Sequence, residues 1–119
     1  MRIANGILCV LMLLFVAVQY NDPDGPWWML IYGVAAFWAG LAAFRPAALT
    51  ARAAMPLWAA SLALAVIGVL YYWPPVAEWW RESVWWEVEE AREGMGLMIV
   101  TIVLLVAGSG LLRMRRIAA

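Results

Sequence analysis

Four long stretches of the chain contain no charged residue, and they constrain the fold more than any other feature. They comprise residues 3–20, 27–44, 56–73 and 94–112, each 18 or 19 residues long. A helix rises about 1.5 Å per residue, so 18 residues span roughly 27 Å, close to the thickness of a hydrocarbon core. In lipid the backbone must pair with itself, which favours helices. The sequence therefore predicts an all-α, integral membrane four-helix bundle, formed as a single domain over residues 1–119.

The composition agrees with a bilayer protein and excludes several classes of site. Hydrophobic residues make up 67% of the chain and charged residues 13%, against about 45–50% and about 25% in soluble domains. The net charge is zero and there is no His, which predicts no nucleic-acid partner and removes the commonest general base and metal ligand. The single Cys9 excludes an internal disulfide or a zinc cluster. The expected partner is the lipid bilayer, with a membrane protein or a second copy of the chain as further partners.

The charges are segregated between the connections. The arginines outside the acidic segments are Arg2, Arg45, Arg52, Arg113, Arg115 and Arg116. The acids, all in the first and third connections, are Asp22, Asp24, Glu78, Glu82, Glu87, Glu89, Glu90 and Glu93. Basic residues remain on the cytoplasmic side of a membrane. Both termini and residues 45–55 are therefore expected in the cytoplasm, with residues 21–26 and 74–93 facing outward. The Ala-rich chain, whose basic residues are all Arg, indicates a bacterial inner membrane.

The first connection is a short polar stretch, Gln19-Tyr20-Asn21-Asp22-Pro23-Asp24-Gly25-Pro26. Proline, glycine and Asx residues at this density favour a tight reversal between two helices. Two interpretations of Asp22 and Asp24 stay open. They cap the following helix, where negative charge is favourable, or they hold a hard cation such as Ca²⁺ or Mg²⁺, which prefers oxygen ligands.

The third connection predicts an amphipathic, Trp-rich interfacial helix over residues 76–93. Pro74 and Pro75 end the preceding helix. An amphipathic helix rich in indole rings suits the membrane interface. The tryptophans expected in an outward aromatic belt are Trp27, Trp28, Trp73, Trp79, Trp80, Trp85 and Trp86. Anchoring in the headgroup region and stacking on a ligand are the two roles open to them.

We expect the two outward connections to meet in an acidic cap. Glu87 and Glu90 are three residues apart, so on one helix they would share a face directed at the bundle or at lipid. A buried carboxylate there needs a partner or a proton, and the available partners are Arg92 or Arg81, the N–H groups of residues 21–25, or a hard cation shared with the aspartates. We also expect Asp22 or Asp24 to lie within bridging reach of Arg92. The candidate cap or ligand residues are Gln19, Asn21, Asp22, Asp24, Glu90, Arg92 and Glu93. The candidate metal ligands among them are Asp22, Asp24, Glu90 and Glu93.

The pattern Gln19-x-Asn21-Asp22-Pro23-Asp24, followed by Trp28 and Tyr32, resembles the transmembrane protein 220 family. An acidic Arg-Glu-x-x-Gly-like element before the last helix of that family is matched by Arg92-Glu93-Gly94 and Gly96. The resemblance spans nearly the whole chain. It implies a small multi-pass membrane protein with no established biochemical activity.

Three functions follow from these expectations. The first is a non-enzymatic membrane protein whose acidic cap is structural or binds a partner. The second is a divalent-cation or small-ligand binding protein, or a transporter component, using the cap carboxylates. The third is a membrane enzyme with Glu90 or Glu93 as general base. No constellation of Ser, His and Asp, or of Cys and His, selects a reaction, so a non-enzymatic role is favoured and no catalytic residue is assigned.

Overall fold

The computed structural model describes residues 2–73 and 78–118, with the side chains of Trp85 and Trp86 outside the described part. Its elements are α1 (Arg2–Val18), α2 (Gly25–Phe44), the 3₁₀ helix η1 (Pro46–Thr50), α3 (Ala54–Tyr71), α4 (Glu82–Glu87) and α5 (Glu89–Ala118). No strand occurs among the described residues. The prediction of an all-α chain is confirmed.

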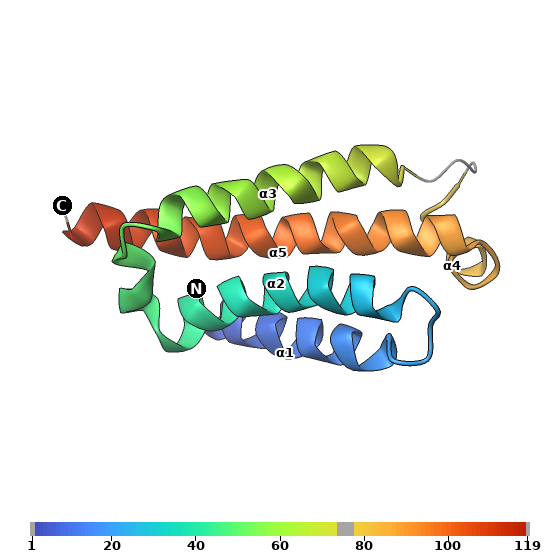
Figure 1. Ribbon diagram of the computed structural model, residues 1–119, viewed down its shortest axis with the longest axis horizontal. Coiled ribbons are helices and arrows are strands. Elements are labelled where there is room, and N and C mark those ends of the chain that lie inside the picture. Colours follow the sequence, from blue (N-terminus) through green and yellow to red (C-terminus); the bar gives the residue numbers. More distant parts are fainter. Residues whose placement is uncertain (1, 74–77, 119) are drawn as a thin grey trace.

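The long helices run side by side in a bundle 48 Å long (Figure 1). α1 packs along α2, α3 packs along α5, and contacts between α2 and α5 join the two pairs. Among the described residues, α2, α3 and α5 are long and apolar enough to cross a membrane, whereas α1 is also apolar but has 17 residues. A membrane protein with several apolar helices is therefore established, and a crossing by α1 stays a prediction.

The core is built on small residues of α2, because they let neighbouring helices approach closely. Ala35, Ala39 and Ala42 are buried, and a Cβ on Gly40 would lie 3.3 Å from the Cys9 sulfur of α1. Two indole N–H groups form hydrogen bonds between helices. Trp38 donates to the Ser61 hydroxyl at 3.1 Å and Trp58 donates to the Leu104 carbonyl at 2.9 Å. Other large apolar side chains, such as Ile3, Leu64 and Leu70, are exposed, as is expected of a surface that meets lipid.

The third connection differs from the predicted single helix over residues 76–93. Residues 76 and 77 lie outside the described part, Glu78 to Arg81 form a turn, and α4 covers only six residues. Val88 is extended (φ −117°, ψ 109°), and α5 begins directly after it. Glu82 lies in the first turn of α4, and Glu89 and Glu90 lie in the first turn of α5. Carboxylates are favourable at helix N-termini, which supports two helix starts in place of one continuous helix.

The predicted aromatic belt falls at the same end of the bundle as α4. Trp27, Trp73 and Trp80 are each more than half exposed. The Trp79 ring contacts both Trp73 and Trp80, with ring centroids 5.7 Å and 5.5 Å apart. Trp28 departs from the prediction, because it is buried in the bundle.

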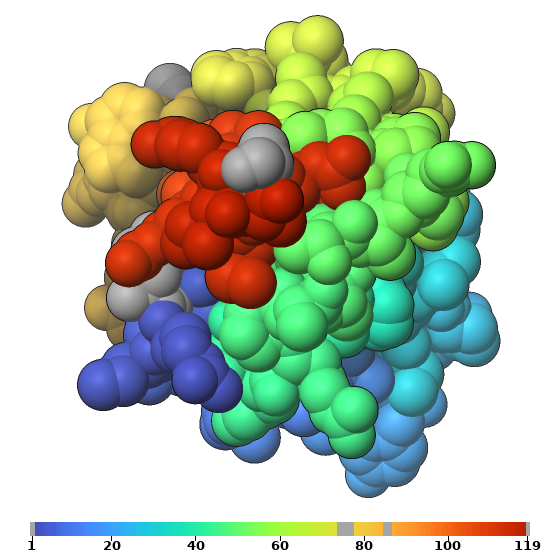
Figure 2. All heavy atoms as spheres, turned by 90° about the vertical axis from the view of Figure 1, so that its left-hand side faces the viewer, coloured from blue at the N-terminus to red at the C-terminus, as the bar shows by residue number. Residues whose placement is uncertain are grey.

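The two ends of the bundle carry opposite charge. The α1–α2 turn, α4 and the start of α5 lie at one end, and the N-terminus, η1 and the C-terminus lie at the other (Figure 1). Figure 2 views the second end, where the start of α1, the connection around η1 and the last turns of α5 meet. Because these segments hold the arginines outside the third connection and no acids, we call this the basic end. The opposite end is the acidic end.

Candidate functional site

The turn between α1 and α2 places Asp24 at the start of α2. The Asp22 N–H donates to the Gln19 carbonyl at 3.1 Å, and the Gly25 N–H donates to the Asp22 carbonyl at 3.0 Å. Gly25 is required here because a Cβ would collide with the Gln19 carbonyl oxygen. Pro26 then fits the first turn of the helix, where an N–H would have no partner. The chain reversal predicted from these residues is therefore present.

Asp24 occupies the N-cap position of α2 but makes no side-chain capping hydrogen bond. Its Oδ2 instead accepts a hydrogen bond from Nε1 of Trp28, one turn further along α2, at 3.0 Å. Asp24 therefore places its negative charge at the start of α2, as one of the two interpretations expects, without a capping hydrogen bond from its side chain. The buried indole fixes the direction of the carboxylate, which leans away from its own helix.

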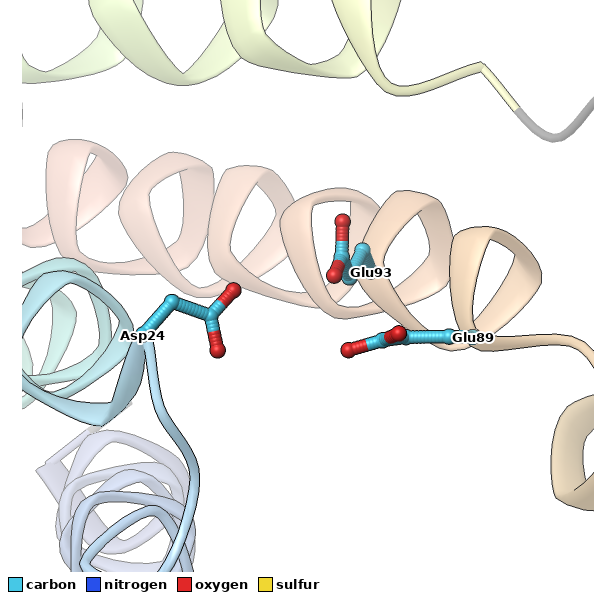
Figure 3. A group of neighbouring side chains, drawn as sticks. All are labelled: Asp24, Glu89 and Glu93. Carbon is cyan, nitrogen blue, oxygen red and sulfur yellow. The ribbon is translucent and has the colours of Figure 1, made fainter.

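Three carboxylates converge at this point. Glu89 and Glu93 are four residues apart in α5, so they project from the same face of that helix. One carboxylate oxygen from each of Asp24, Glu89 and Glu93 lies within 4.8 Å of the other two. Figure 3 shows Asp24 approaching from the start of α2 and the two glutamates from the first turns of α5. We call these three residues the carboxylate cluster.

The cluster lies at a pocket of about 440 Å³ between α1, α2 and α5. Its apolar walls are Phe15, Val18, Trp28, Tyr32, Met95 and Ile99, with Gly96 between them. Its polar lining is Gln19, Asp22, Asp24, Glu89, Arg92 and Glu93. Four carboxylates and one guanidinium give the pocket a net negative charge. Concave, mostly apolar sites with a few converging polar groups are typical of small-ligand sites.

The hydroxyl of Tyr32 is the buried polar group of this pocket. The residue is 7% exposed, and its ring packs edge-on against Phe15, with centroids 5.2 Å apart. Its hydroxyl lies directly against Gly96 of α5, where any Cβ would collide with it. A glycine is therefore needed at position 96 for Tyr32 to reach the inner face of α5.

The carboxyl group of Glu93 differs from an ordinary surface glutamate. It precedes the apolar part of α5, residues 94–112, and is half-buried. Burial, and after it the negative charges of Glu89, Asp24 and Glu90, together raise the pKa of Glu93 to about 7. Near neutral pH the protonated and ionised forms of this group are therefore both populated.

The predicted site residues divide into two sets. Gln19, Asp22, Asp24, Arg92 and Glu93 all line the pocket. Asn21 and Glu90 are exposed and belong to neither the pocket lining nor the carboxylate cluster. The shared face predicted for Glu87 and Glu90 is wrong, because Val88 separates them into two helices and both are exposed. An Asp–Arg92 bridge stays a prediction, since the structure shows only that Arg92 lines the same pocket as the aspartates.

Eight residues of the pocket lining are absent from the predicted site, and four of them, Glu89, Trp28, Tyr32 and Gly96, shape its polar part. The spacing of four between Glu89 and Glu93 indicates that both lie on one face of a helix, which is the signal in the sequence for Glu89. Trp28 and Tyr32 lie four and eight residues after Asp24, on one face of α2. Gly96 carries no signal of its own, because its role depends on the Tyr32 hydroxyl of another helix.

The lining determines which chemistry is available. Ionised carboxylates only accept hydrogen bonds and coordinate cations. Like charges held this close favour a cation or a shared proton. The described pocket lining contains no Ser, Cys or Thr to act as a nucleophile. The arrangement therefore suits cation binding better than covalent catalysis.

Comparison with known proteins adds one match. The family model described as "Transmembrane family 220, helix" matches residues 11–109. This range runs from the middle of α1 to the second half of α5 and includes every residue of the pocket lining. No curated protein and no solved structure matches the chain significantly.

Proposed function

The chain belongs to the transmembrane family 220, and we propose that it is a non-enzymatic membrane protein that binds a cation in the pocket at its acidic end. The family match confirms the resemblance drawn from the sequence and carries no established activity with it. The function proposed here therefore depends on the pocket alone.

The proposed topology has four membrane crossings in a bacterial inner membrane, with both termini in the cytoplasm. The positions of the charges support it, since a bundle with arginines at one end and acids at the other has a preferred orientation. The pocket then opens outward. Reporter fusions test the topology directly: a C-terminal tail found outside the cytoplasm would reverse it.

The observation that carries cation binding is the convergence of Asp24, Glu89 and Glu93 from two helices. Each pair of like charges raises the free energy of the folded state unless a proton or a cation intervenes. A bound cation removes this repulsion and adds attraction to all three oxygens. A divalent metal cofactor such as Ca²⁺ or Mg²⁺ meets this requirement. An organic cation meets it as well.

Thermal unfolding of the purified protein in detergent micelles tests the proposal. CaCl₂, MnCl₂ and butylammonium chloride are titrated separately against NaCl at matched ionic strength. A ligand at about 100 times its Kd stabilises the folded state by about 2.7 kcal/mol. We expect saturable stabilisation by at least one of the three salts in the wild type and in Glu82→Gln, an exposed acid outside the cluster. We expect its loss in Asp24→Asn.

A structural lid is the second candidate, and the hydrogen bond from Trp28 to Asp24 favours it. In that case the carboxylates and Arg92 hold the α1–α2 turn against α5, as a fixed closure or as a docking site for a membrane partner. Asp24→Asn would then lower the unfolding temperature in NaCl alone, and none of the three salts would act through Asp24. That result would overturn cation binding.

A further inference from the structure

We propose that a groove between α1 and α2 at the basic end binds one anionic phospholipid, with the lipid phosphate at Arg2 and an acyl chain along the groove. The groove lies at the opposite end of the bundle from the carboxylate cluster. This second site therefore goes beyond the proposed function and does not depend on it.

The groove is apolar apart from one arginine. It has a volume of about 700 Å³ and is lined by Arg2, Ile3, Gly6, Ile7, Val10, Ala43 and Phe44. Ile3, Ile7 and Val10 are three or four positions apart, so they form one stripe along α1. These three side chains and Phe44 are each more than half exposed. The groove is therefore open to whatever surrounds the bundle, which in a membrane protein is lipid.

The stripe along α1 has nearly the length of one leaflet. From Arg2 to Val10 the helix rises about 12 Å, at about 1.5 Å per residue, and half of a hydrocarbon core is roughly 15 Å thick. Arg2 is the first residue of α1, and Arg45 directly follows the last residue of α2. Both arginines therefore stand at the headgroup end of the stripe, and an acyl chain fits along the remainder.

A hydrogen bond to α2 holds Arg2 at the end of the groove. Its Nε donates to the Ala43 carbonyl at 2.8 Å, so the guanidinium bridges the two helices that form the groove. A guanidinium has five N–H donors, and this bond uses the donor on Nε. The two terminal nitrogens carry the paired donors that match phosphate oxygens. The bond to Ala43 thus positions a phosphate-binding group where the groove begins.

The charge of the basic end favours a lipid as the occupant. Six arginines lie at this end, whereas all the acidic side chains of the chain lie within residues 22–24 and 78–93. A second copy of the chain that met the groove with the same face would add further arginines, and like charges repel at close range. Clusters of basic residues at a membrane surface attract anionic lipids. A phospholipid of net negative charge therefore complements both the arginines and the apolar stripe.

Native mass spectrometry of the full chain, released from dodecyl maltoside micelles, tests the site. Dioleoyl phosphatidylglycerol, dioleoyl phosphatidylcholine and dioleoylglycerol are titrated separately, because they share acyl chains and differ in charge. We expect phosphatidylglycerol to bind at least about fivefold more tightly than zwitterionic phosphatidylcholine. Dioleoylglycerol, which has no phosphate, should bind most weakly. This comparison uses the wild type and does not depend on the folding of any variant.

Two pairs of variants locate the phosphate and the acyl chain. Arg2→Gln removes the paired donors and should weaken phosphatidylglycerol about tenfold, whereas Arg52→Gln, at an exposed arginine of the same end outside the groove, should change its affinity by less than about twofold. Ile7→Ala should weaken it by at least about threefold, the effect of one buried methylene. Leu64→Ala, at a similarly exposed residue of α3, should have no effect. Unfolding temperatures without lipid check that each variant is folded.

Several results would overturn the lipid site. Equal affinities for phosphatidylglycerol and dioleoylglycerol would show that no phosphate is recognised, and equal losses in Arg2→Gln and Arg52→Gln would indicate a general attraction to the basic end. Displacement of the lipid by inorganic phosphate would show that the groove does not hold the chain. Dimers that form without lipid and dissociate in Ile7→Ala would assign the groove to a second copy. None of these measurements involves the carboxylate cluster, so failure of either site leaves the other intact.

Discussion

The charged side chains at the two ends of the bundle have different partners. At the basic end, Arg2 donates from Nε to the Ala43 carbonyl at 2.8 Å, and Arg115 donates to the Ala51 carbonyl at 3.1 Å. At the acidic end, three carboxylates face one another, and one of them accepts the indole N–H of Trp28.

The difference follows from what each charged group can bind within a helical bundle. Helix C-termini and the turns after them offer carbonyl oxygens, and guanidinium groups satisfy these directly. Carboxylates need N–H donors, and Asp24 makes no capping bond with the N–H groups of α2. Arg2 and Arg115 at the basic end are thus paired with backbone carbonyls, whereas three carboxylates face one another at the acidic end. Substitutions at the two ends should therefore differ in their effects on stability and on cation binding.

The largest effect is expected from packing in the half of the bundle nearer the basic end. A Cβ at Gly108 would meet the Trp58 ring, including one atom at 2.6 Å. Gly108→Ala should therefore displace Trp58, weaken its bond to Leu104 and destabilise the fold by about 1–3 kcal/mol. Gly33→Ala is the matched control, because nothing lies within 4 Å of its Cβ position, and it should be neutral or stabilising. Denaturant unfolding in micelles measures both, and an unchanged midpoint for Gly108→Ala would contradict the packing.

A smaller effect is expected from the bond that links core and cluster. Trp28→Phe removes the donor to Asp24 and should cost about 1–2 kcal/mol, since hydrogen bonds to charged groups are stronger than neutral ones. It should also weaken any cation bound at Asp24. Trp27→Phe, at the exposed neighbour, should change neither property. If the two variants had the same free energy of unfolding and the same cation affinity, Trp28 would have no role in the site.

The pH dependence of stability comes third. A glutamate whose folded-state pKa is raised from 4.5 to about 7 binds its proton more tightly in the folded state. Stability without a cation should then fall as pH rises from about 4.5 to about 7, and level off above. The groups facing Glu93 are Glu89, Glu90, Asp24 and, around the same pocket, Asp22, Tyr32 and Arg92.

Glu93→Gln should flatten this part of the profile, whereas Arg115→Gln at the basic end should leave it unchanged. Unfolding temperatures at several pH values measure the difference between the variants and the wild type. Cation affinity should rise over the same interval, because the cation competes with the proton. If the unfolding temperatures of the wild type and Glu93→Gln changed with pH in the same way, a group other than Glu93 would be responsible for the titration.

The smallest effect is expected from the ion pair between Arg81 and Glu78, at 2.8 Å and more than half exposed on both sides. Exposed pairs contribute about 0–1 kcal/mol, so Arg81→Gln should change stability by less than about 0.5 kcal/mol. Its cation response should match that of the wild type. A larger loss of stability in thermal unfolding would indicate that the acidic site includes residues outside the pocket.

The sequence predicts the middle of the bundle better than its ends. The predicted ranges 27–44 and 56–73 lie within two residues of α2 and α3 at every boundary. The last helix was expected over residues 94–112 and instead covers Glu89–Ala118. Apolar runs mark the part of a helix that suits lipid, whereas the helix itself continues into water where Glu89 and Arg116 complement its termini.

The candidate site is predictable only in part, and for a different reason. Asp24 and Glu93 were chosen because charge segregation brings both outward connections to one end. Which acids then meet depends on the direction in which each side chain leaves its helix. Val88 is extended and ends α4, so Glu87 and Glu89 lie on two separate helices. The place of the Tyr32 hydroxyl over Gly96 is a contact between helices, and no local pattern in either segment indicates it.

The carboxylate cluster joins the first loop of the chain to its final helix. During synthesis, Asp24 is added more than sixty residues before Glu89 and Glu93. A truncated product can insert its early hairpin yet never assemble the ligand pocket. A chain that stops before Glu89 lacks two of the three carboxylates, so the cluster forms only after synthesis has reached α5.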